Sequence, residues 1–210
     1  MIISHEHKFL FLAPPKVGSM SVRQSLLEYS SIDPVKFYTD SSNVYYHEWH
    51  MNAKNAKKHF DVRGWDWDSY FKFSFVRNPW DRIISWRNYQ ILYVNEFEQF
   101  GKREAVYYKE YKKLSKLSFK DWVEDYGWLE SFIDSCMCYS DNNCLDFIGR
   151  FENLQEDFNT ICDKIGIPRQ ELPHHNESKH KHYTEYYDDE TKQIIAERFA
   201  PDIEYFNYKF

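Results

Sequence analysis

The chain has 210 residues, enough for one α/β domain with a real core and few to spare for a second. Its formal net charge of −6 at pH 7 excludes a bulk electrostatic attraction to nucleic acid or to an anionic membrane, so any anion site must be a local cluster of basic residues. No apolar run is long enough to span a membrane, and no basic stretch followed by an apolar segment opens the chain. We therefore expect a cytoplasmic protein without an integral membrane segment.

The cysteines are few and carry no sign of secretion. The chain contains Cys136, Cys138, Cys144 and Cys162, and without a secretory signature we expect reduced thiols rather than bridges. The pair Cys136-x-Cys138 lacks a second CxxC or a pair of histidines at a zinc-like spacing. We therefore expect no metal site.

The first clear element is an apolar strand, Phe9–Leu12, which stops at Pro14-Pro15. A turn of small residues follows and opens a short amphipathic helix, with the sequence Lys16-Val17-Gly18-Ser19-Met20-Ser21. Such a turn directs backbone N–H groups and the positive end of the helix dipole at one point, where a phosphate or sulfate group can bind. It is not a Walker A loop, in which lysine follows the second glycine. The alternative is a plain turn with Ser19 or Ser21 as the helix N-cap.

A second candidate residue is His50, which precedes a run with Ala53, Ala56 and Phe60 at helical spacing. At a helix N-terminus the dipole lowers the pKa of an imidazole, and a neutral ring is what a general base requires. The alternative is an exposed capping histidine with no catalytic role.

A second strand–helix junction lies near the middle of the chain. Residues Phe71–Val76 predict a strand, and the helix after it begins near Pro79. Arg77 therefore stands at the carboxyl end of a strand, as Lys16 does, and Ser85 lies about two turns into the helix. Ligands of open α/β sheets gather at this edge, and an arginine fork with a hydroxyl suits a terminal phosphate. The alternative is an arginine paired with Asp81 or another carboxylate in a structural network.

The remaining elements follow from periodicity and from turn residues. We predict a helical, aromatic-rich insertion at about 91–140, a strand over 145–151, a helix over 154–165 capped by Gly166, and a last helix over 191–199 that Pro201 ends. The aromatic tail is expected to pack back onto the domain. Between the last two helices lies a loop with Lys179, Lys181 and four histidines, which is either a metal tract or, as we favour, an anion-contacting lid.

From about Phe9 to Phe210 the chain resembles the PAPS-dependent sulfotransferases of the carbohydrate type, the group that includes heparan sulfate 2-O-sulfotransferase and short bacterial relatives. Pro15-Lys16-Val17-Gly18-Ser19-Met20-Ser21 is similar to the family's 5′-phosphosulfate loop, Pro-Lys-x-Gly-Ser-Thr-Ser. Phe75-Val76-Arg77-Asn78-Pro79-Trp80-Asp81-Arg82-Ile83-Ile84-Ser85 is similar to its 3′-phosphate motif. Arg150-Phe151-Glu152-Asn153-Leu154 and the ending Asp202–Phe210 also resemble its members.

The resemblance implies a single α/β domain over residues 1–210, with a central parallel sheet flanked by helices and a P-loop-like phosphosulfate loop after the first strand. It implies PAPS as donor, PAP as product and no metal. Lys16 is expected at the leaving oxygen and His50 as the base, with His47 as the alternative base. The residues expected to bind the donor are Lys16, Val17, Gly18, Ser19, Met20, Ser21, Arg77, Ser85, Lys179 and Lys181. Met20 stands where the family usually has threonine, so one hydroxyl contact to the phosphate is missing unless Ser19 or Ser21 supplies it.

Two other classes of protein remain open on the residues alone. A P-loop phosphotransferase would share the architecture, but it should carry a Walker A lysine and a Mg²⁺-binding acid. A non-catalytic nucleotide-binding domain would keep Arg77 and Ser85 and tolerate the loss of His50. The aromatic content, 17 Tyr, 17 Phe and 7 Trp, suggests an acceptor with a sugar, polyol or glycolipid hydroxyl, because rings stack on sugar faces.

Overall fold

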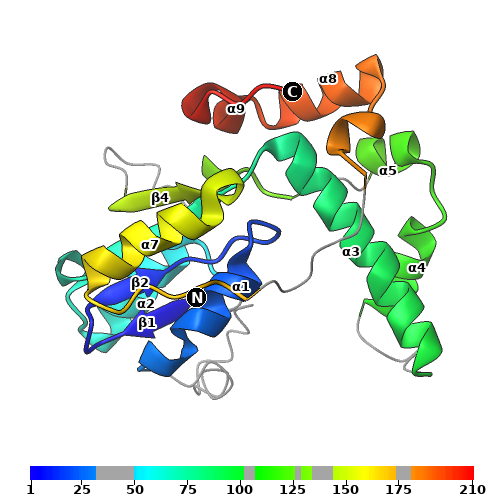
Figure 1. Cartoon of the computed structure of the whole chain (residues 1–210). Helices are drawn as coiled ribbons and strands as arrows, with labels where there is room; N and C mark the ends of the chain where they lie inside the picture. The colour runs from blue at the N-terminus through cyan, green and yellow to red at the C-terminus, as the bar shows by residue number, and fades with distance from the viewer. Residues whose placement is uncertain (32–49, 102–106, 126–128, 134–143, 174–180) are drawn as a thin grey trace. The chain divides into compact units, whose positions relative to one another are not determined.

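The computed structural model describes residues 1–31, 50–101, 107–125, 129–133, 144–173 and 181–210 (Figure 1). The chain divides into two compact units: unit 1 is Met1–Arg77 with Phe132–Asn176, and unit 2 is Asn78–Ser131 with Glu177–Phe210. Some predicted features lie outside the described residues. These are His47, Lys179, Cys136, Cys138 and parts of the insertion expected at about 91–140.

Unit 1 holds the sheet, whose described strands lie in the order β1-β2-β3-β4: β1 Ile2–Ser4, β2 Phe9–Phe11, β3 Phe71–Val76 and β4 Phe147–Arg150. Strands β2, β3 and β4 are parallel, and β1 pairs antiparallel with β2. The predicted α/β fold is thus confirmed, with a mixed sheet. Sequence reasoning missed β1, because three residues are too few to show a period. The candidate loop therefore follows the second strand rather than the first.

The helical elements of unit 1 lie in the connections between and after these strands. They are α1 Ser19–Leu26, η1 Leu27–Tyr29, α2 Ala53–Arg63, η4 Trp67–Ser69, η5 Phe151–Asn153 and α7 Leu154–Ile165. The predicted strand β3 and helix α7 match their observed bounds, and Gly166 ends α7 with a φ of 72°. Asn52 begins α2 and its side chain accepts a hydrogen bond from the Asn55 N–H.

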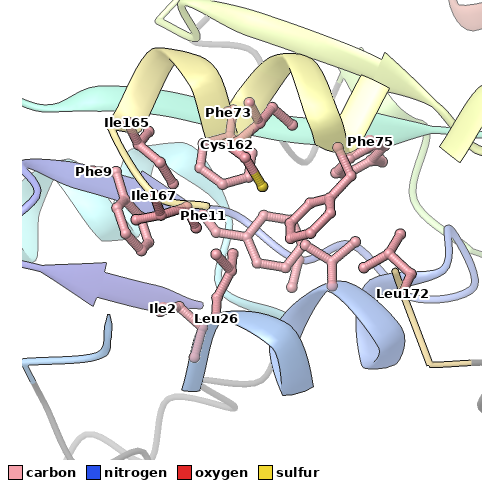
Figure 2. Close-up of a cluster of buried hydrophobic side chains, with 14 of the residues drawn as sticks. Ile2, Phe9, Phe11, Leu26, Phe73, Phe75, Cys162, Ile165, Ile167 and Leu172 are labelled. Carbon is pink, nitrogen blue, oxygen red and sulfur yellow. The ribbon is translucent and has the colours of Figure 1, made fainter. Parts of the chain in front are cut away.

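The core of unit 1 forms because alternate residues of a strand point to the same face of the sheet. Phe9 and Phe11 of β2 and Phe73 and Phe75 of β3 are fully buried in one cluster. Figure 2 shows these phenylalanines with residues of α1 and α7 that complete the cluster, Leu26, Cys162 and Ile165 among them. On the opposite face, Leu10 and Leu12 are also fully buried. Burial on both faces explains why the strand reads as a continuous apolar run.

The described part of unit 2 is helical: α3 Pro79–Gln99, α4 Tyr108–Leu114, α5 Phe119–Asp125, η6 Tyr183–Glu185, α8 Asp189–Arg198 and α9 Ala200–Phe206. Helices α3 and α4 contact each other through rings, with the Tyr111 ring edge-on to those of Trp86 and Tyr93. Helices α5 and α8 are joined by an ion pair of 2.7 Å between Lys120 Nζ and Glu190 Oε2. The aromatic-rich segment is thus helical over most of its described residues.

The end of the chain differs from the prediction at Pro201. This residue lies in the first turn of α9 instead of closing the previous helix, because proline is accepted where the backbone N–H has no partner within the helix. The aromatic tail packs back within unit 2, as expected. The Phe210 ring lies edge-on to Trp80, Tyr183 and Tyr187, with centroid distances of 5.5–5.6 Å.

Two kinds of feature are absent from the described residues. None of their helices is long and apolar enough to cross a membrane. In the same residues, no group of three or more His, Cys, Asp or Glu side chains is placed to hold a metal ion. Cys162 is a free thiol, and burial raises its pKa to about 11.

Candidate functional site

The β2–α1 loop, residues 12–18, has an unusual backbone. Lys16 has a φ of 67° and Gly18 a φ of 78°, so two residues of the loop adopt the left-handed conformation with buried Val17 between them. A lysine rarely adopts this conformation, which costs about 1 kcal/mol or more and persists only where the surroundings enforce it. The turn leads from β2 into α1, so the N-terminus of that helix lies at the loop.

Gly18 itself is the N-cap of α1, and no side chain completes that end of the helix. Ser19 and Ser21 lie inside the first turn, so neither is the N-cap that the plain-turn alternative required. The first turn also contains no acidic residue. A helix start with unsatisfied N–H groups and no negative side chain is suited to an anion.

The residue at position 18 must also be small. An added Cβ would lie 2.8 Å from Leu154 Cδ2 and 3.1 Å from Phe151 Cδ2, so both conformation and space require glycine. Phe151 and Leu154 belong to the segment that sequence reasoning compared with the sulfotransferases. In the structure, the side chains of this segment pack beside Gly18 and support the loop.

Arg77 reaches the same loop from the carboxyl end of β3. Its Nη1 donates a hydrogen bond of 3.1 Å to the backbone carbonyl of Lys16, and its guanidinium carbon lies 3.8 Å from the centroid of the Phe151 ring. The side chain is buried, so this cation is held in a fixed place. Burial, followed by repulsion from the charge of Arg77, lowers the pKa of Lys16 to about 8. Two cations held together in this way favour the arrival of an anion.

His50 is joined to the loop by a hydrogen bond of 2.6 Å between its Nδ1 and the carbonyl of Ala13. A carbonyl only accepts, so Nδ1 carries the hydrogen, and a neutral ring then has its basic lone pair on Nε2. The side chain is exposed, and it stands two positions before Asn52, the N-cap of α2. This fixes both the tautomer and the place of the ring at the loop.

Two further residues predicted to bind the donor, Ser85 and Lys181, belong to unit 2. Ser85 is buried on α3, in its second turn, and Asn78 caps that helix through hydrogen bonds from the N–H groups of Trp80 and Asp81. Lys181 is exposed, and its Nζ forms an ion pair of 3.2 Å with Glu185. Unit 1 thus brings together Lys16, Gly18, Arg77 and His50.

Sequence reasoning did not foresee two participants in the site. One is the Ala13 carbonyl, which orients His50, and no sequence signal marks a backbone acceptor. The other is Phe151, whose ring lies under Arg77. Its resemblance to family members was noted, but an aromatic residue after a strand carries no chemical signal of a partner.

The site combines two cationic side chains and a helix N-terminus with a candidate base. Lys16, Arg77 and the first N–H groups of α1 favour a group with several negative oxygens. An imidazole with a defined basic nitrogen is held at the same loop. This set fits the transfer of an anionic group to a hydroxyl, with fixed cations where charge develops and a base for the proton.

Comparison with known proteins gives a consistent result. A sequence model of the sulfotransferase family matches residues 1–209. Among curated relatives, an uncharacterized protein of Archaeoglobus fulgidus is 29% identical over 127 residues, which cover 58% of this chain and 83% of the relative. Human carbohydrate sulfotransferase 9 is 25% identical, covering 96% of this chain and 47% of that protein. Carbohydrate sulfotransferase 10 of Xenopus laevis is 25% identical, covering 100% and 67%.

The chain therefore spans about half the length of the human relative. No solved structure matches it.

Proposed function

The chain belongs to the sulfotransferase family, and we propose that it moves the sulfonate group of PAPS to a hydroxyl of a carbohydrate or related acceptor. The observation that carries this proposal is the meeting of three functional side chains at one loop. Arg77 donates to the Lys16 carbonyl, and His50 is bonded to the Ala13 carbonyl. A structural loop has no need of two cations and an oriented imidazole.

The donor would be held by its two phosphate ends. We assign its 5′-phosphosulfate to Lys16 and to the backbone from Val17 through Gly18, Ser19 and Met20 to Ser21. We assign its 3′-phosphate to Arg77 and Ser85, with Lys179 and Lys181 as lid contacts. PAP is then the product, and no metal is required, because lysine and backbone N–H groups balance the charge of the leaving phosphate.

The transfer itself is an in-line displacement at sulfur. PAPS supplies an activated sulfonate whose bond to the phosphate oxygen breaks as the acceptor oxygen attacks. His50 Nε2 takes the proton of the acceptor hydroxyl, and the electron pair of the broken bond stays on the PAP oxygen next to Lys16. A fixed donor at such an oxygen typically contributes roughly 3–4 kcal/mol to transition-state stabilisation.

The acceptor is proposed from the relatives and from composition. Two of the curated relatives carry the name carbohydrate sulfotransferase, which supports a sugar hydroxyl as the acceptor here. We treat the whole chain, residues 1–210, as one sulfotransferase domain, with the helical aromatic-rich segment at about 91–140 as its insertion. Neither nucleic acid nor metal has a part in the proposal, and the cytoplasmic location remains a prediction of the sequence.

Calorimetric titration with PAP in metal-free buffer tests the donor site. We expect the wild type to bind and Arg77→Ala to lose binding, because a buried guanidinium is removed from the 3′-phosphate. Arg169→Ala is the matched control, since Arg169 is an exposed arginine of the same unit that pairs with Asp163. Failure of the folded wild type to bind PAP, or binding of ATP with Mg²⁺ in its place, would overturn the proposal.

The catalytic roles need a second measurement, of turnover with PAPS and a panel of sugar acceptors. Lys16→Ala should lower turnover by roughly 10²–10³-fold. His50→Ala should abolish transfer and leave PAP affinity unchanged, because the base contacts the acceptor. Retained turnover in His50→Ala together with its loss in His47→Ala would move the base to His47.

A further inference from the structure

The side chain of Asn78, at the start of α3, has every hydrogen-bonding position of its amide occupied. Its Oδ1 accepts from the N–H groups of Trp80 and Asp81, at 3.1 and 3.5 Å, and so caps the helix. Its Nδ2 donates to the Lys209 carbonyl at 3.0 Å and to the Tyr183 hydroxyl at 3.5 Å. A carboxamide has two N–H donors and one oxygen with two lone pairs, so these four contacts use its full capacity. Asn78 thus joins the first turn of α3 to two segments that lie 105 and 131 residues further along the chain.

Trp80 is held by the same part of unit 2. Its buried indole donates a hydrogen bond of 3.1 Å from Nε1 to the Lys192 carbonyl of α8. Its backbone carbonyl accepts a hydrogen bond of 2.8 Å from the Tyr187 hydroxyl. These two contacts do not involve the Asn78 amide. The first turn of α3 is therefore held at two residues, in both cases by segments that are distant in the sequence.

Phe210 packs among the residues that make these contacts. Its ring lies edge-on to the rings of Trp80, Tyr183 and Tyr187, and Lys192 Nζ lies 4.4 Å from its centroid. Edge-on ring pairs and a cation near a ring both stabilise such a cluster. Because the Phe210 side chain is still 36% exposed, its main effect falls on these four neighbours rather than on a buried core. We call the following seven residues the Phe210 network: Asn78, Trp80, Tyr183, Tyr187, Lys192, Lys209 and Phe210.

The network holds the segment that carries the proposed 3′-phosphate contacts. Arg77 directly precedes Asn78, and Ser85 lies on α3 about 10 Å along the helix axis from Asn78. Because a helix is stiff over two turns, tilting its first turn displaces Ser85. The peptide bond between Arg77 and Asn78 carries the same movement to the Arg77 backbone. Binding of a phosphate by a guanidinium fork and a hydroxyl requires both groups to be fixed in place, so such movements lower the affinity.

We propose that Phe210 and Asn78 are positioning residues of the donor site. In this role neither side chain touches the donor. Together they fix the start of α3, so that Ser85 and the backbone of Arg77 stand where the 3′-phosphate binds. This inference rests on the proposed function. It predicts that loosening the network weakens recognition of the 3′-phosphate and spares the 5′-phosphosulfate contacts of the β2–α1 loop, which is part of unit 1.

Calorimetry with two ligands tests this role. PAP carries both phosphate ends, whereas adenosine 5′-phosphosulfate lacks the 3′-phosphate, and its affinity is measured by competition with PAP. We expect Phe210→Ala to bind PAP roughly tenfold more weakly and to bind adenosine 5′-phosphosulfate within about twofold of the wild type. Phe210→Tyr keeps the ring and should restore the PAP affinity to within about twofold.

Asn78→Ser separates capping of the helix from positioning. Serine also caps helices well, but it has no NH2 group to reach the Lys209 carbonyl, and the charge of the segment stays the same. We expect this variant to keep more stability than Asn78→Ala and still to bind PAP roughly fivefold more weakly than the wild type. It decides the question by itself if Phe210→Ala does not fold.

Two controls separate positioning from a general loss of stability. Tyr205→Ala removes a ring of α9 that is 54% exposed, and Val94→Ala opens a cavity at a buried site of α3. Both should bind PAP within about twofold of the wild type, although Val94→Ala unfolds at lower urea concentration. Wild-type PAP affinity in the folded variants of Phe210 and Asn78 overturns the inference, as does an equal loss in Val94→Ala or an equal loss for both ligands. A folded wild type that does not bind PAP overturns the proposed function, and the inference falls with it.

Discussion

Helices α1 and α3 each follow a strand of the sheet, yet their first turns are completed in different ways. The first turn of α1 has glycine as its N-cap, no side-chain cap and no acidic residue. In α3, the Asn78 side chain accepts hydrogen bonds from the Trp80 and Asp81 N–H groups, and Asp81 adds a negative charge. The start of α1 can receive an anion through its backbone, whereas the start of α3 is already satisfied. An anion near the start of α3 would therefore depend on side chains rather than on the backbone of that helix.

The largest expected effect comes from closing the open helix start, with Gly18→Ala. Its φ of 78° disfavours alanine, and the new Cβ would lie 2.8 Å from Leu154 Cδ2, so the loop must move. We expect PAP binding to fall by at least 100-fold and the free energy of unfolding to drop by about 1–3 kcal/mol. Calorimetry and urea unfolding measure the two effects.

Gly64→Ala is the matched control for that variant. Gly64 has a φ of 66° but no atom within 4 Å of the added Cβ, so it bears the backbone cost without the collision. It should lose about 1 kcal/mol of stability and keep full PAP affinity. Equal loss of binding in both variants would mean that the loop is not the donor site.

The next effect concerns protonation of Lys16, whose pKa is lowered to about 8 by burial and by the nearby Arg77 charge. Above pH 8 most of the free protein carries a neutral Lys16, and a bound anion favours its charged form. Binding of PAP at pH 9 should therefore draw a proton from the buffer. Titration in two buffers of different ionisation enthalpy measures this uptake, and Lys16→Met should abolish it. Identical uptake in Lys16→Met would assign the proton to another group.

A smaller effect is expected at the satisfied helix start. Asn78→Ala removes the cap of α3 and should lower the free energy of unfolding by about 1–2 kcal/mol. Ser19→Ala should cost less than Asn78→Ala, because Ser19 caps nothing. Thermal unfolding of both variants provides the comparison. A larger loss from Ser19→Ala would show that its hydroxyl supports α1 after all.

The smallest effect is a gain. Met20 is 45% exposed in the first turn of α1, where the related loop has threonine. Met20→Thr supplies a hydroxyl at the open helix start and should raise PAP affinity by roughly two- to fivefold, the contribution of about one hydrogen bond. Calorimetry compares the PAP affinity of Met20→Thr with that of the wild type. No change would indicate that Ser19 or Ser21 already provides this contact.

Much of the fold could be read from local patterns. Strand β3 and helix α7 follow from alternation and from helical spacing, and Gly166 marks the end of α7. Strand β1 was not predicted, because its pairing with β2 defines it and no local sequence pattern does. Pro201 was read as a stop because proline both ends helices and begins them, and sequence alone does not say which.

The site was predictable only in part, for a related reason. Lys16 and Arg77 follow strands, and parallel strands end at one edge, so their neighbourhood could be inferred. The left-handed backbone of Lys16 could not, because nothing in a lysine side chain favours it. The bond from His50 to Ala13 and the contact of Arg77 with Phe151 depend on how distant segments pack, which local spacing does not encode.

The order of the strands also determines when the site can form during synthesis. Among the described strands, only β1 and β2 are joined as a local hairpin, whereas Phe9 pairs with Phe71 and Phe73 pairs with Phe147. Parallel pairs of such separation require long loops to close before they contribute stability, which slows folding. Phe151 and Leu154, which support Gly18, emerge from the ribosome later still. We therefore expect the nascent chain to expose the β2–α1 loop early but to fix its shape only after Phe151 and Leu154 have been synthesised.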